Sequence, residues 1–366
     1  MQVTQIAASE IDASLTRRWH ALQAHPDHPE WLHPFLSPEF ARITGEIRPR
    51  SRVALVEDAG RLVGLWAYEA LPGGLALPLA RHMSDLQGLL MAPEADDPLP
   101  WLVKACGLRC VRFDHVLPRT GLQPALVSAS MRTGWMIDLS EGFEAYRMVQ
   151  ARQSRWWRRA AGKARRLSEA LGPLSWQDDV RDDEAWRMLA RWKSEQYRQS
   201  GLRDNFAIAW VRQWLECLRW SDAPALQGTL QSLRAGDRLV AVHFGVRGHH
   251  ILHHYLPAYD HALALYSPGS VLLEQTLRQA PGQGLSLIDM STGDLEYKQA
   301  VSNLQRSLAT GMMAPAWLGR MATQMQALER WLRQSPGLLP VARRSRRAFI
   351  QLVNGPAGRS GRGATG

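Results

Sequence analysis

Apolar and polar residues alternate in several short runs of the chain, and two pairs of these runs are joined by turns that contain Asp and Gly. Alternation with a period of two is typical of strands, and such a turn between two runs predicts a β-hairpin. We therefore expect hairpins over 53–68 and 226–246, and further strands over 111–116, 250–256 and 285–289.

Apolar residues spaced three and four positions apart predict helices between these strands. They include one long helix over 143–171 and shorter helices over 211–220 and 268–279. Prolines interrupt the helix and loop expected over 1–50, where Ser37-Pro38 has the composition of a helix start. The pattern as a whole predicts a mixed α/β (α+β) fold.

Helices precede each hairpin and further elements follow it, which suggests two similar halves, 1–140 and 141–312. Beyond them we expect a helical basic extension over 313–354 and a disordered tail over 355–366. The reason is that no acidic residue occurs after Glu329, while arginine and glycine are frequent near the end of the chain.

The chain has 366 residues, of which 45% are hydrophobic, and this is enough for a large buried core. No apolar run approaches the roughly 20 residues of a membrane-spanning helix. The first residues lack the pattern of a signal peptide. Three cysteines, Cys106, Cys110 and Cys217, form neither a metal-binding spacing nor an even disulfide set. We therefore expect a cytoplasmic protein with reduced thiols.

The formal net charge of +10 predicts an anionic partner. Paired arginines near the end of the chain suit phosphate and guanine, and they predict a response to cyclic di-GMP or peripheral contact with an anionic inner membrane. These residues are Arg343, Arg344, Arg346 and Arg347. An unstructured solubilising tail explains the same residues. Specific DNA binding is not expected, because the basic residues are not interleaved with stacking aromatic residues.

A second basic surface follows from helical spacing within 143–171. Five cations repeat every three or four residues and fall on one stripe of a helix: Arg152, Arg155, Arg159, Lys163 and Arg166. A neighbouring stripe is apolar: Val149, Trp156, Ala160, Leu167 and Leu171. No acid interrupts 145–168, so pairing along the helix leaves the row positive. We expect the row to bind phosphate, with a solvated helix face as the alternative.

Two segments combine turn residues with polar side chains. Tyr266-Ser267-Pro268-Gly269 leads from a strand into a helix, whose first amides lack partners and favour an anion such as pyrophosphate. The apolar strand at 287–288 leads into a polar loop that ends at Tyr297-Lys298. Ligands gather at strand ends in α/β sheets, so both segments are candidate binding sites. A plain connection and local Asx turns are the simpler interpretations.

Six histidines lie between 243 and 261. Alternation points His253 and His254 to opposite faces of their strand, so we expect no metal site. His243 is a candidate general base, because an unperturbed histidine titrates near neutral pH. The signatures of P-loop nucleotide binding, nucleophile-elbow hydrolases and zinc proteases are missing from the sequence.

The two segments together resemble the signature of the CelD/BioF2-like acetyltransferase domain. A Pro-Gly helix start matches 266–273, and a D-x-x-x-G-D-x-x-Y-K element matches Asp289 to Lys298. The basic helix over 154–167 and a K-x-x-Q-Y element at 193–197 add to the resemblance, which covers about 143–312.

This resemblance implies tandem GNAT-like (FemAB-like) domains with mixed, mostly antiparallel sheets flanked by helices, the first half being degenerate. It implies an N-acyltransferase that moves an acyl group from acetyl-CoA or another acyl-CoA to an amine, and no metal. The acceptor implied is a nucleotide- or lipid-linked amino sugar of bacterial exopolysaccharide biosynthesis. An aminoacyl-tRNA or carrier-protein donor, and a non-catalytic component of a polysaccharide machine, remain alternatives.

On this resemblance we assign roles to residues of both segments. The donor is expected at the helix start: Ser267, Gly269, Ser270 and Val271. The base or amine-orienting group is Asp289 or Glu296, and His243 stands in reserve. Tyr266 or Tyr297 is the acid, and Lys298 pairs with a carboxylate or phosphate of the substrate. Four further contacts to substrate or phosphate are expected from Arg155, Arg159, Lys163 and Tyr297.

Overall fold

The structure is a computed structural model that describes residues 1–91, 99–117, 128–293 and 295–313. Residues 1–312 form one compact unit. The basic extension expected over 313–354 continues past the last described residue, and the tail expected over 355–366 lies wholly outside the described residues. Arg343, Arg344, Arg346, Arg347 and Asp294 also lie outside them. Among the described helices, none has the length and apolar composition needed to cross a membrane.

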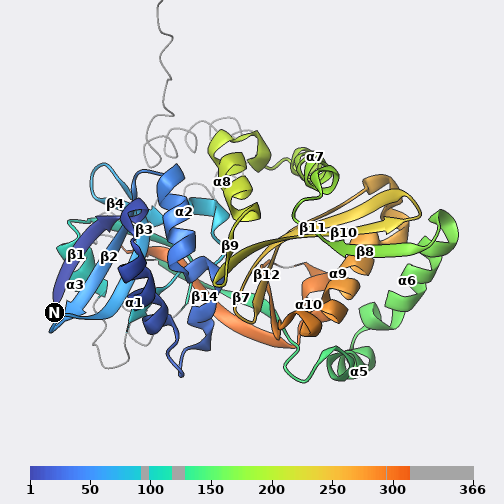
Figure 1. Cartoon of the computed structure of the whole chain (residues 1–366), viewed down its shortest axis with the longest axis horizontal. Coiled ribbons are helices and arrows are strands. Elements are labelled where there is room, and N and C mark those ends of the chain that lie inside the picture. The colour runs from blue at the N-terminus through green and yellow to red at the C-terminus, as the bar shows by residue number, and fades with distance from the viewer. Residues whose placement is uncertain (92–98, 118–127, 294, 314–366) are drawn as a thin grey trace, which may run out of the picture. The chain divides into compact units, whose positions relative to one another are not determined.

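The strands and helices follow one another along the chain as Figure 1 labels them. The strands are β1 (Gln2–Ala7), β2 (Ser51–Asp58), β3 (Arg61–Leu71), β4 (Leu75–Pro78), β5 (Leu89–Met91), β6 (Cys110–Val116), β7 (Ser128–Asp138), β8 (Leu174–Asp178), β9 (Asp222–Ala223), β10 (Leu226–Ala235), β11 (Arg238–Gly248), β12 (Ile251–Tyr259), β13 (Leu287–Thr292) and β14 (Leu304–Met313). The helices are α1 (Ala13–Gln23), α2 (Pro38–Ile47), α3 (Leu99–Ala105), α5 (Phe143–Gln153), α6 (Arg155–Leu171), α7 (Asp183–Gln199), α8 (Ala209–Arg219), α9 (Pro268–Gln279) and α10 (Glu296–Val301).

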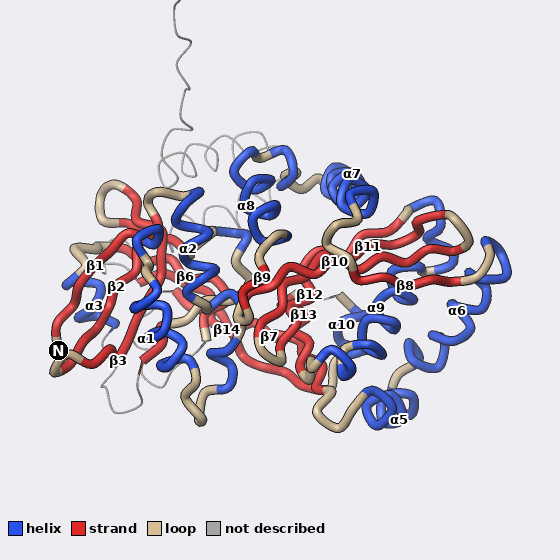
Figure 2. Tube along the Cα trace, viewed as in Figure 1, coloured by secondary structure: helices blue, strands red, loops and turns tan. Residues whose placement is uncertain are grey.

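One mostly antiparallel sheet contains all the described strands (Figure 2). Its order is β1-β2-β3-β4-β6-β14-β7-β13-β12-β11-β10-β8, with β5 on β3 and β9 on β10. The pairs β4–β6 and β12–β13 are parallel. The strand that ends the first half of the sequence, β7, lies between β14 and β13 of the second half. The boundary expected at residue 140 therefore falls within one sheet.

Local sequence signals placed several elements correctly. Both predicted hairpins form, and Ala59 (φ 47°), Gly60 (φ 78°) and Gly236 (φ 55°) take the left-handed conformations that tight hairpin turns require. The helix start at Ser37 is confirmed, because the Ser37 hydroxyl accepts the Phe40 amide at 3.1 Å. The helix expected over 268–279 forms with those bounds.

Two expectations were wrong, and a third holds only in part. The long helix over 143–171 is broken at Ser154, whose hydroxyl caps α6 by accepting the Trp156 amide at 3.2 Å. The apolar stripe holds within α6, where Ala160 and Leu167 are buried, but Val149 of α5 is 52% exposed. Residues 2–7, expected as helix or loop, pair with β2 as an edge strand.

Different helices pack on the two faces of the second-half strands. Side chains of α2, α7 and α8 share one apolar cluster that runs from the first half into the second. Trp214 of α8 joins α2 directly, because its indole Nε1 donates to Thr44 at 3.0 Å. The opposite face packs against α5, α6, α9 and α10 (Figure 1). The candidate site is bordered by α9 and α10 of this second face and also by α7.

Candidate functional site

A cavity of about 390 Å³ opens where the start of α9 meets the loop before α10. The residues around it come from α7, β12, α9, β13 and α10, from the segments that lead into α9 and α10, and from the loop after β4. They are Asp85, Lys193, Gln196, His254, Tyr255, Pro257, Tyr259, Ala264, Ser267, Gly269, Ser270, Leu273, Ser291, Leu295, Tyr297 and Lys298. The two segments that the sequence singled out, 266–273 and 289–298, therefore border one space.

The helix start contributes a positively charged corner. Ser267 has φ 53°, and its carbonyl accepts the amides of Ser270 and Val271 at 2.9 and 3.3 Å. Gly269 keeps the corner open, because a Cβ there would lie 3.3 Å from the Tyr259 ring. Val271 is 1% exposed in the core, so its side chain does not reach the cavity.

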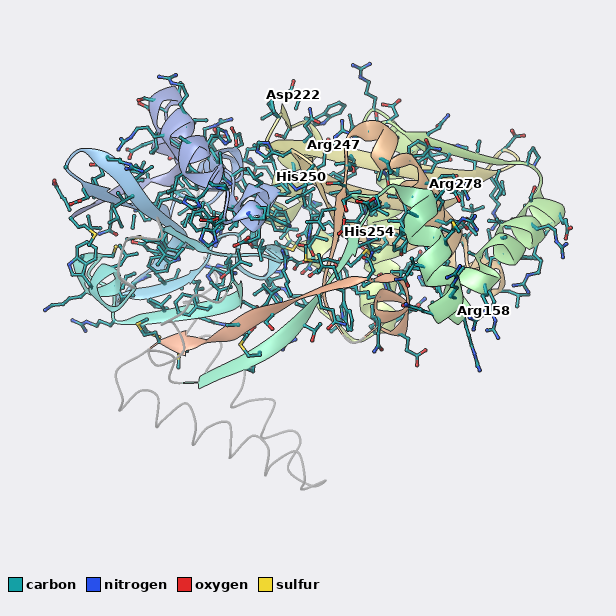
Figure 3. The ribbon with its side chains drawn as sticks, turned by 90° about the horizontal axis from the view of Figure 1, so that it is seen from below. Arg158, Asp222, Arg247, His250, His254 and Arg278 are labelled. Carbon is teal, nitrogen blue, oxygen red and sulfur yellow. The ribbon has the colours of Figure 1, made fainter. Side chains whose placement is uncertain are left out.

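The basic row of α6 reaches this corner through one member. Lys163 Nζ donates to the Ser270 hydroxyl at 3.2 Å, and it lies 5.2 Å from the centre of the Trp156 ring. Burial, together with Arg159 and Arg166, lowers the pKa of Lys163. Arg155 and Arg159 are exposed and do not line the cavity. Arg158 of the same helix projects away from the sheet (Figure 3).

The polar loop contributes Tyr297 and Lys298 to the cavity. Lys298 Nζ donates to the Thr292 carbonyl at 2.7 Å, and burial lowers its pKa. Burial raises the pKa of Tyr297 to about 12, so its hydroxyl stays protonated at neutral pH. Glu296 is exposed at the start of α10 and outside the lining, and Tyr266 packs on an apolar cluster instead. Of the two tyrosines considered as acid, the cavity holds Tyr297.

Asp289 lies behind the cavity, not in its wall. Its Oδ2 pairs with Arg306 of β14 and lies 3.0 Å from Nε2 of His33 and 3.5 Å from Nδ1 of His253. Its Oδ1 accepts the Ser291 amide at 2.7 Å. Burial would raise the pKa of Asp289, but Arg306 and the two histidines outweigh it and hold the pKa well below the usual range. This carboxylate is a buried anion whose partners are all protein groups, so it is not placed to touch a substrate amine.

His33, His253 and Asp289 also bring three potential metal-ligand atoms within 4.8 Å of one another. The Phe35 amide donates to Nδ1 of His33 at 3.1 Å, so Nδ1 carries the lone pair and Nε2 the proton. Burial lowers the pKa of His33 to about 4, which keeps the ring neutral. The protonated Nε2 lies 3.0 Å from Asp289, but neither it nor Nδ1 of His253 meets hydrogen-bond geometry with the carboxylate. The Arg306 guanidinium, which pairs with the same oxygen, opposes binding of a cation.

A carboxylate that sequence reasoning missed, Asp85, faces the cavity from the first half. His253 joins it to the buried network, with Nε2 3.3 Å from Asp85 Oδ2. Burial alone would lower the pKa of His253, but Asp289 and Asp85 outweigh it and raise the pKa above its ordinary value. The bond from His253 likewise outweighs burial and lowers the pKa of Asp85. The register of the parallel pair β12–β13 sets His253 opposite Asp289.

The other histidines of this region differ in position. His243 is fully buried, its Nδ1 lies 3.0 Å from Gln231, and burial holds its pKa well below 6.5. It stacks on His254 with ring centres 3.9 Å apart. His254 lines the cavity and lies near the middle of the view in Figure 3. Burial lowers the pKa of His254 to about 3. His243 is therefore a structural residue, and both rings are neutral.

The K-x-x-Q-Y element sets two polar side chains on one face of α7. Lys193 and Gln196 both line the cavity, and Lys193 Nζ donates to Gln196 Oε1 at 2.9 Å. Burial, and then the nearby Lys298, lower the pKa of Lys193 to about 8. The cavity thus combines one carboxylate with two ammonium groups, three tyrosines and a neutral histidine.

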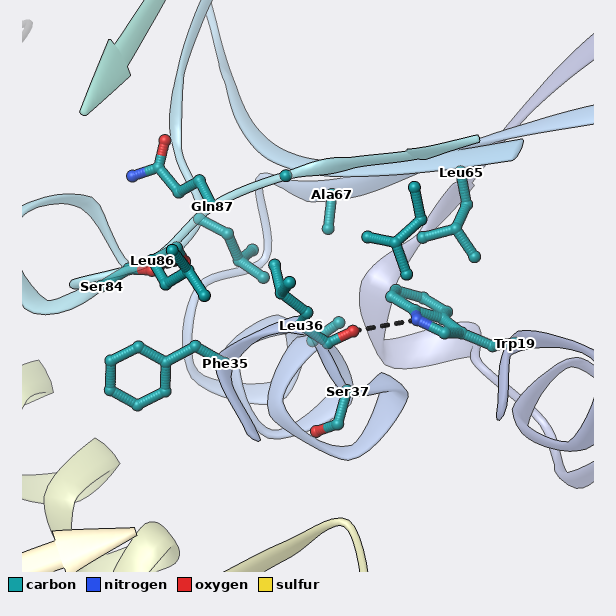
Figure 4. Close-up of a pocket in the computed structure, with 13 residues that line it drawn as sticks. Trp19, Phe35, Leu36, Ser37, Leu65, Ala67, Ser84, Leu86 and Gln87 are labelled. Carbon is teal, nitrogen blue, oxygen red and sulfur yellow. Dashed lines mark hydrogen bonds between the residues drawn. The ribbon is translucent and has the colours of Figure 1, made fainter. Parts of the chain in front are cut away.

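A second, much smaller void of about 20 Å³ lies in the first half (Figure 4). Trp19, Phe35, Leu36 and Leu65 fill its surroundings, and the Trp19 indole donates to the Leu36 carbonyl at 3.0 Å. A space of this size holds about one water molecule. It leaves no room for an acyl donor.

Part of the chain is similar to a known family. Residues 155–299 match the family model of the acetyltransferase (GNAT) domain. That stretch runs from the start of α6 into α10 and includes most of the residues around the cavity. No curated protein sequence matches the chain.

Solved structures are similar to the chain over most of its length. FemX is 9% identical, with 87% of this chain and 98% of that chain covered and a TM-score of 0.57. The C-terminal DUF2156 domain of a candidate lysylphosphatidylglycerol synthetase from Agrobacterium fabrum is 10% identical, with coverage of 86% and 95% and a TM-score of 0.52. A tandem GNAT protein of the clavulanic acid pathway is 13% identical, with coverage of 86% and 99% and a TM-score of 0.46. The likeness to FemX confirms the expected fold class.

Proposed function

We propose that the protein is an N-acyltransferase that moves an acyl group from a phosphate-bearing thioester, such as acetyl-CoA, to an amine. One observation carries the proposal: a single cavity joins the start of α9 to Asp85, Lys193 and Lys298. The match of 155–299 to the acetyltransferase domain supports it. The expected amino-sugar acceptor and the exopolysaccharide pathway remain predictions within it, as does a cytoplasmic location.

The donor's phosphates are assigned to the corner formed by Ser270, Gly269 and Lys163. A helix start and an ammonium group both favour an anion, and Lys163 already contacts Ser270 at 3.2 Å. The thioester then extends from this corner into the cavity. Its carbonyl oxygen becomes negatively charged during attack, and the protonated Tyr297 and the cationic lysines are the groups available to stabilise it.

The acceptor amine is assigned to Asp85. The ammonium form of the amine is attracted to the Asp85 carboxylate. Lys193 and Lys298 disfavour a third positive charge in the cavity, so they promote transfer of a proton from the ammonium group to Asp85. The amine nitrogen then forms a C–N bond to the acyl carbon and the thioester C–S bond breaks. As the C–S bond breaks, Tyr297 protonates the leaving thiolate and is itself restored by the second proton of the nitrogen. Asp85 releases the first proton to solvent, which balances the step. Asp289 acts through His253 as a positioning residue.

The test is turnover of acetyl-CoA with glucosamine and other amines, followed by release of free thiol and by the mass of the product. Asp85→Asn is expected to lower kcat/KM by about a hundredfold, the usual size of an acid–base contribution. Asp222→Asn is the matched control, since Asp222 is exposed on β9 and outside the cavity lining. Full activity of the Asp85 variant would remove this assignment, and absence of acyl transfer to any amine would remove the proposed function.

An aminoacyl-tRNA donor is a second candidate. The exposed Arg155 and Arg159 extend the positive surface outward from Lys163 along α6, where a nucleic-acid backbone has room to lie. Such a donor predicts binding of tRNA that weakens steeply with salt, together with competition between tRNA and acetyl-CoA. Tight acetyl-CoA binding with no tRNA competition decides for the thioester.

A further inference from the structure

Lysine is scarce in this chain, and its distribution is uneven. Of the 44 basic residues, four are lysines: Lys104, Lys163, Lys193 and Lys298. Two of them line the cavity and a third contacts its Ser270 wall, whereas Lys104 is exposed on α3. Arginine supplies the positive charge elsewhere. A lysine ammonium is a compact point charge that accommodates a single anionic group in a confined space.

Lys193 and Lys298 have neutral partners. Lys193 donates to the Gln196 side chain at 2.9 Å, and Lys298 to the Thr292 carbonyl at 2.7 Å. Among the described residues, no carboxylate lies within ion-pair distance of either ammonium group. Asp85 lies in the same cavity and, with Asp289, favours the charge of Lys298, but two ammonium groups face this single carboxylate of the lining. The excess positive charge is unfavourable, so a negative group of the ligand is the missing partner.

The donor's phosphates do not fill this role in the proposed arrangement. They are assigned to Lys163 and Ser270 at the start of α9, where Lys163 forms its own contact. Lys193 comes from α7 and Lys298 from α10, and both share the cavity with Asp85. Asp85 is the acidic side chain among the lining residues, and it is held by His253 at 3.3 Å. The inner cavity therefore presents one anion and two cations.

We infer that the acceptor is an amino-carboxylate, an amine with a carboxylate beside it, whose ammonium group binds Asp85 and whose carboxylate binds Lys193 and Lys298. This inference rests on the proposed function and narrows its acceptor class. Amino acids and acidic amino sugars both carry the required pair of charges. A neutral amino sugar such as glucosamine lacks the carboxylate and leaves both lysines unpaired.

Calorimetric binding to the whole protein, without donor, tests the inference independently of acyl transfer. The probes are matched pairs: muramic acid against glucosamine, and each common amino acid against its α-carboxamide. At least one acid is expected to bind tenfold or more tightly than its neutral partner, about the effect of one charge-assisted hydrogen bond. Lys193→Gln and Lys298→Gln are each expected to reduce this preference to less than about threefold, while Lys104→Gln leaves it unchanged. Circular dichroism confirms that each variant is folded.

The inference is overturned if no acid binds more tightly than its neutral partner, or if the preference survives both cavity variants. It is also overturned if the preference appears instead between succinyl-CoA and acetyl-CoA, because the carboxylate then belongs to the donor. Selective binding of an acid by a protein that transfers no acyl group supports the amino-carboxylate site and removes the proposed function alone.

Discussion

Replacing Lys193 by methionine is expected to stabilise the folded protein near neutral pH. The Lys193 side chain is 8% exposed, and burial and Lys298 lower its pKa from 10.5 to about 8. At about 1.4 kcal/mol for each pKa unit, keeping this lysine charged in the folded state costs about 3 kcal/mol. Methionine has a similar length and no charge. Gln196 loses its partner but is exposed, so its amide turns to water.

The dependence on pH distinguishes this cause from packing. Because the pKa of Lys193 is lower in the folded state than in the unfolded state, the unfolded chain binds more protons between these two pKa values. Wild-type stability therefore rises as the pH increases from about 8 to about 10.5 and is lowest below that window. Methionine does not titrate. The advantage of the variant is thus largest below about pH 8 and disappears as the pH approaches about 10.5.

Urea unfolding of the wild type and the variant at about pH 7 and about pH 9.5 measures both effects. Lys104→Met is the matched control, because Lys104 is exposed and its replacement is expected to change the free energy of unfolding by less than about 0.5 kcal/mol. The reasoning is refuted if Lys193→Met is less stable than the wild type at the lower pH. A stability difference of equal size at both pH values also refutes it.

Three further substitutions probe the frame around the site. Asp289→Ala is expected to destabilise the fold by about 3–5 kcal/mol in urea unfolding, because it leaves the Arg306 guanidinium without its carboxylate; a loss below about 1 kcal/mol contradicts this. Gly228→Ala is expected to destabilise by about 1–3 kcal/mol, since its Cβ would lie 2.4 Å from the Arg219 carbonyl oxygen. Gly162→Ala, which meets nothing within 4 Å in α6, is expected to stabilise by about 0.5–1 kcal/mol. Thermal unfolding of the two glycine variants side by side checks their opposite signs, and a shift of Tm in the same direction rejects the contrast.

Elements with local causes were predictable from the sequence. The hairpin turn at Ala59-Gly60 and the helix start at Pro268 depend on residues adjacent in the chain. The central strands β7 and β14 were not found, because their pairing joins segments about 170 residues apart and neither shows strict alternation. Gly134 illustrates this dependence: a Cβ there would lie 3.0 Å from the Arg306 side chain, which is a contact between those strands.

The site was predictable only in its second-half part. The motif drew attention to Tyr297 and Lys298, and both line the cavity. The role given to Asp289 followed from the same resemblance, whereas its surroundings include Arg306 and His33, which the sequence separates from it. Asp85 belongs to no motif and is brought to the cavity by tertiary packing. The α7 side of the cavity was marked in the sequence by the spacing of Lys193 and Gln196, which sets both on one face of that helix.

The first half contributes residues to the site and a strand to the sheet, although its own void is too small for a donor. It supplies Asp85 to the cavity and His33 to the network behind it, and its last strand, β7, pairs with both β13 and β14. A fragment limited to 141–312 would expose the edges of β13 and β14 and leave Asp289 without its neighbour His33. The proposed function therefore needs both halves, because the carboxylate proposed to bind the amine, Asp85, lies outside the stretch 155–299 that matches the acetyltransferase domain.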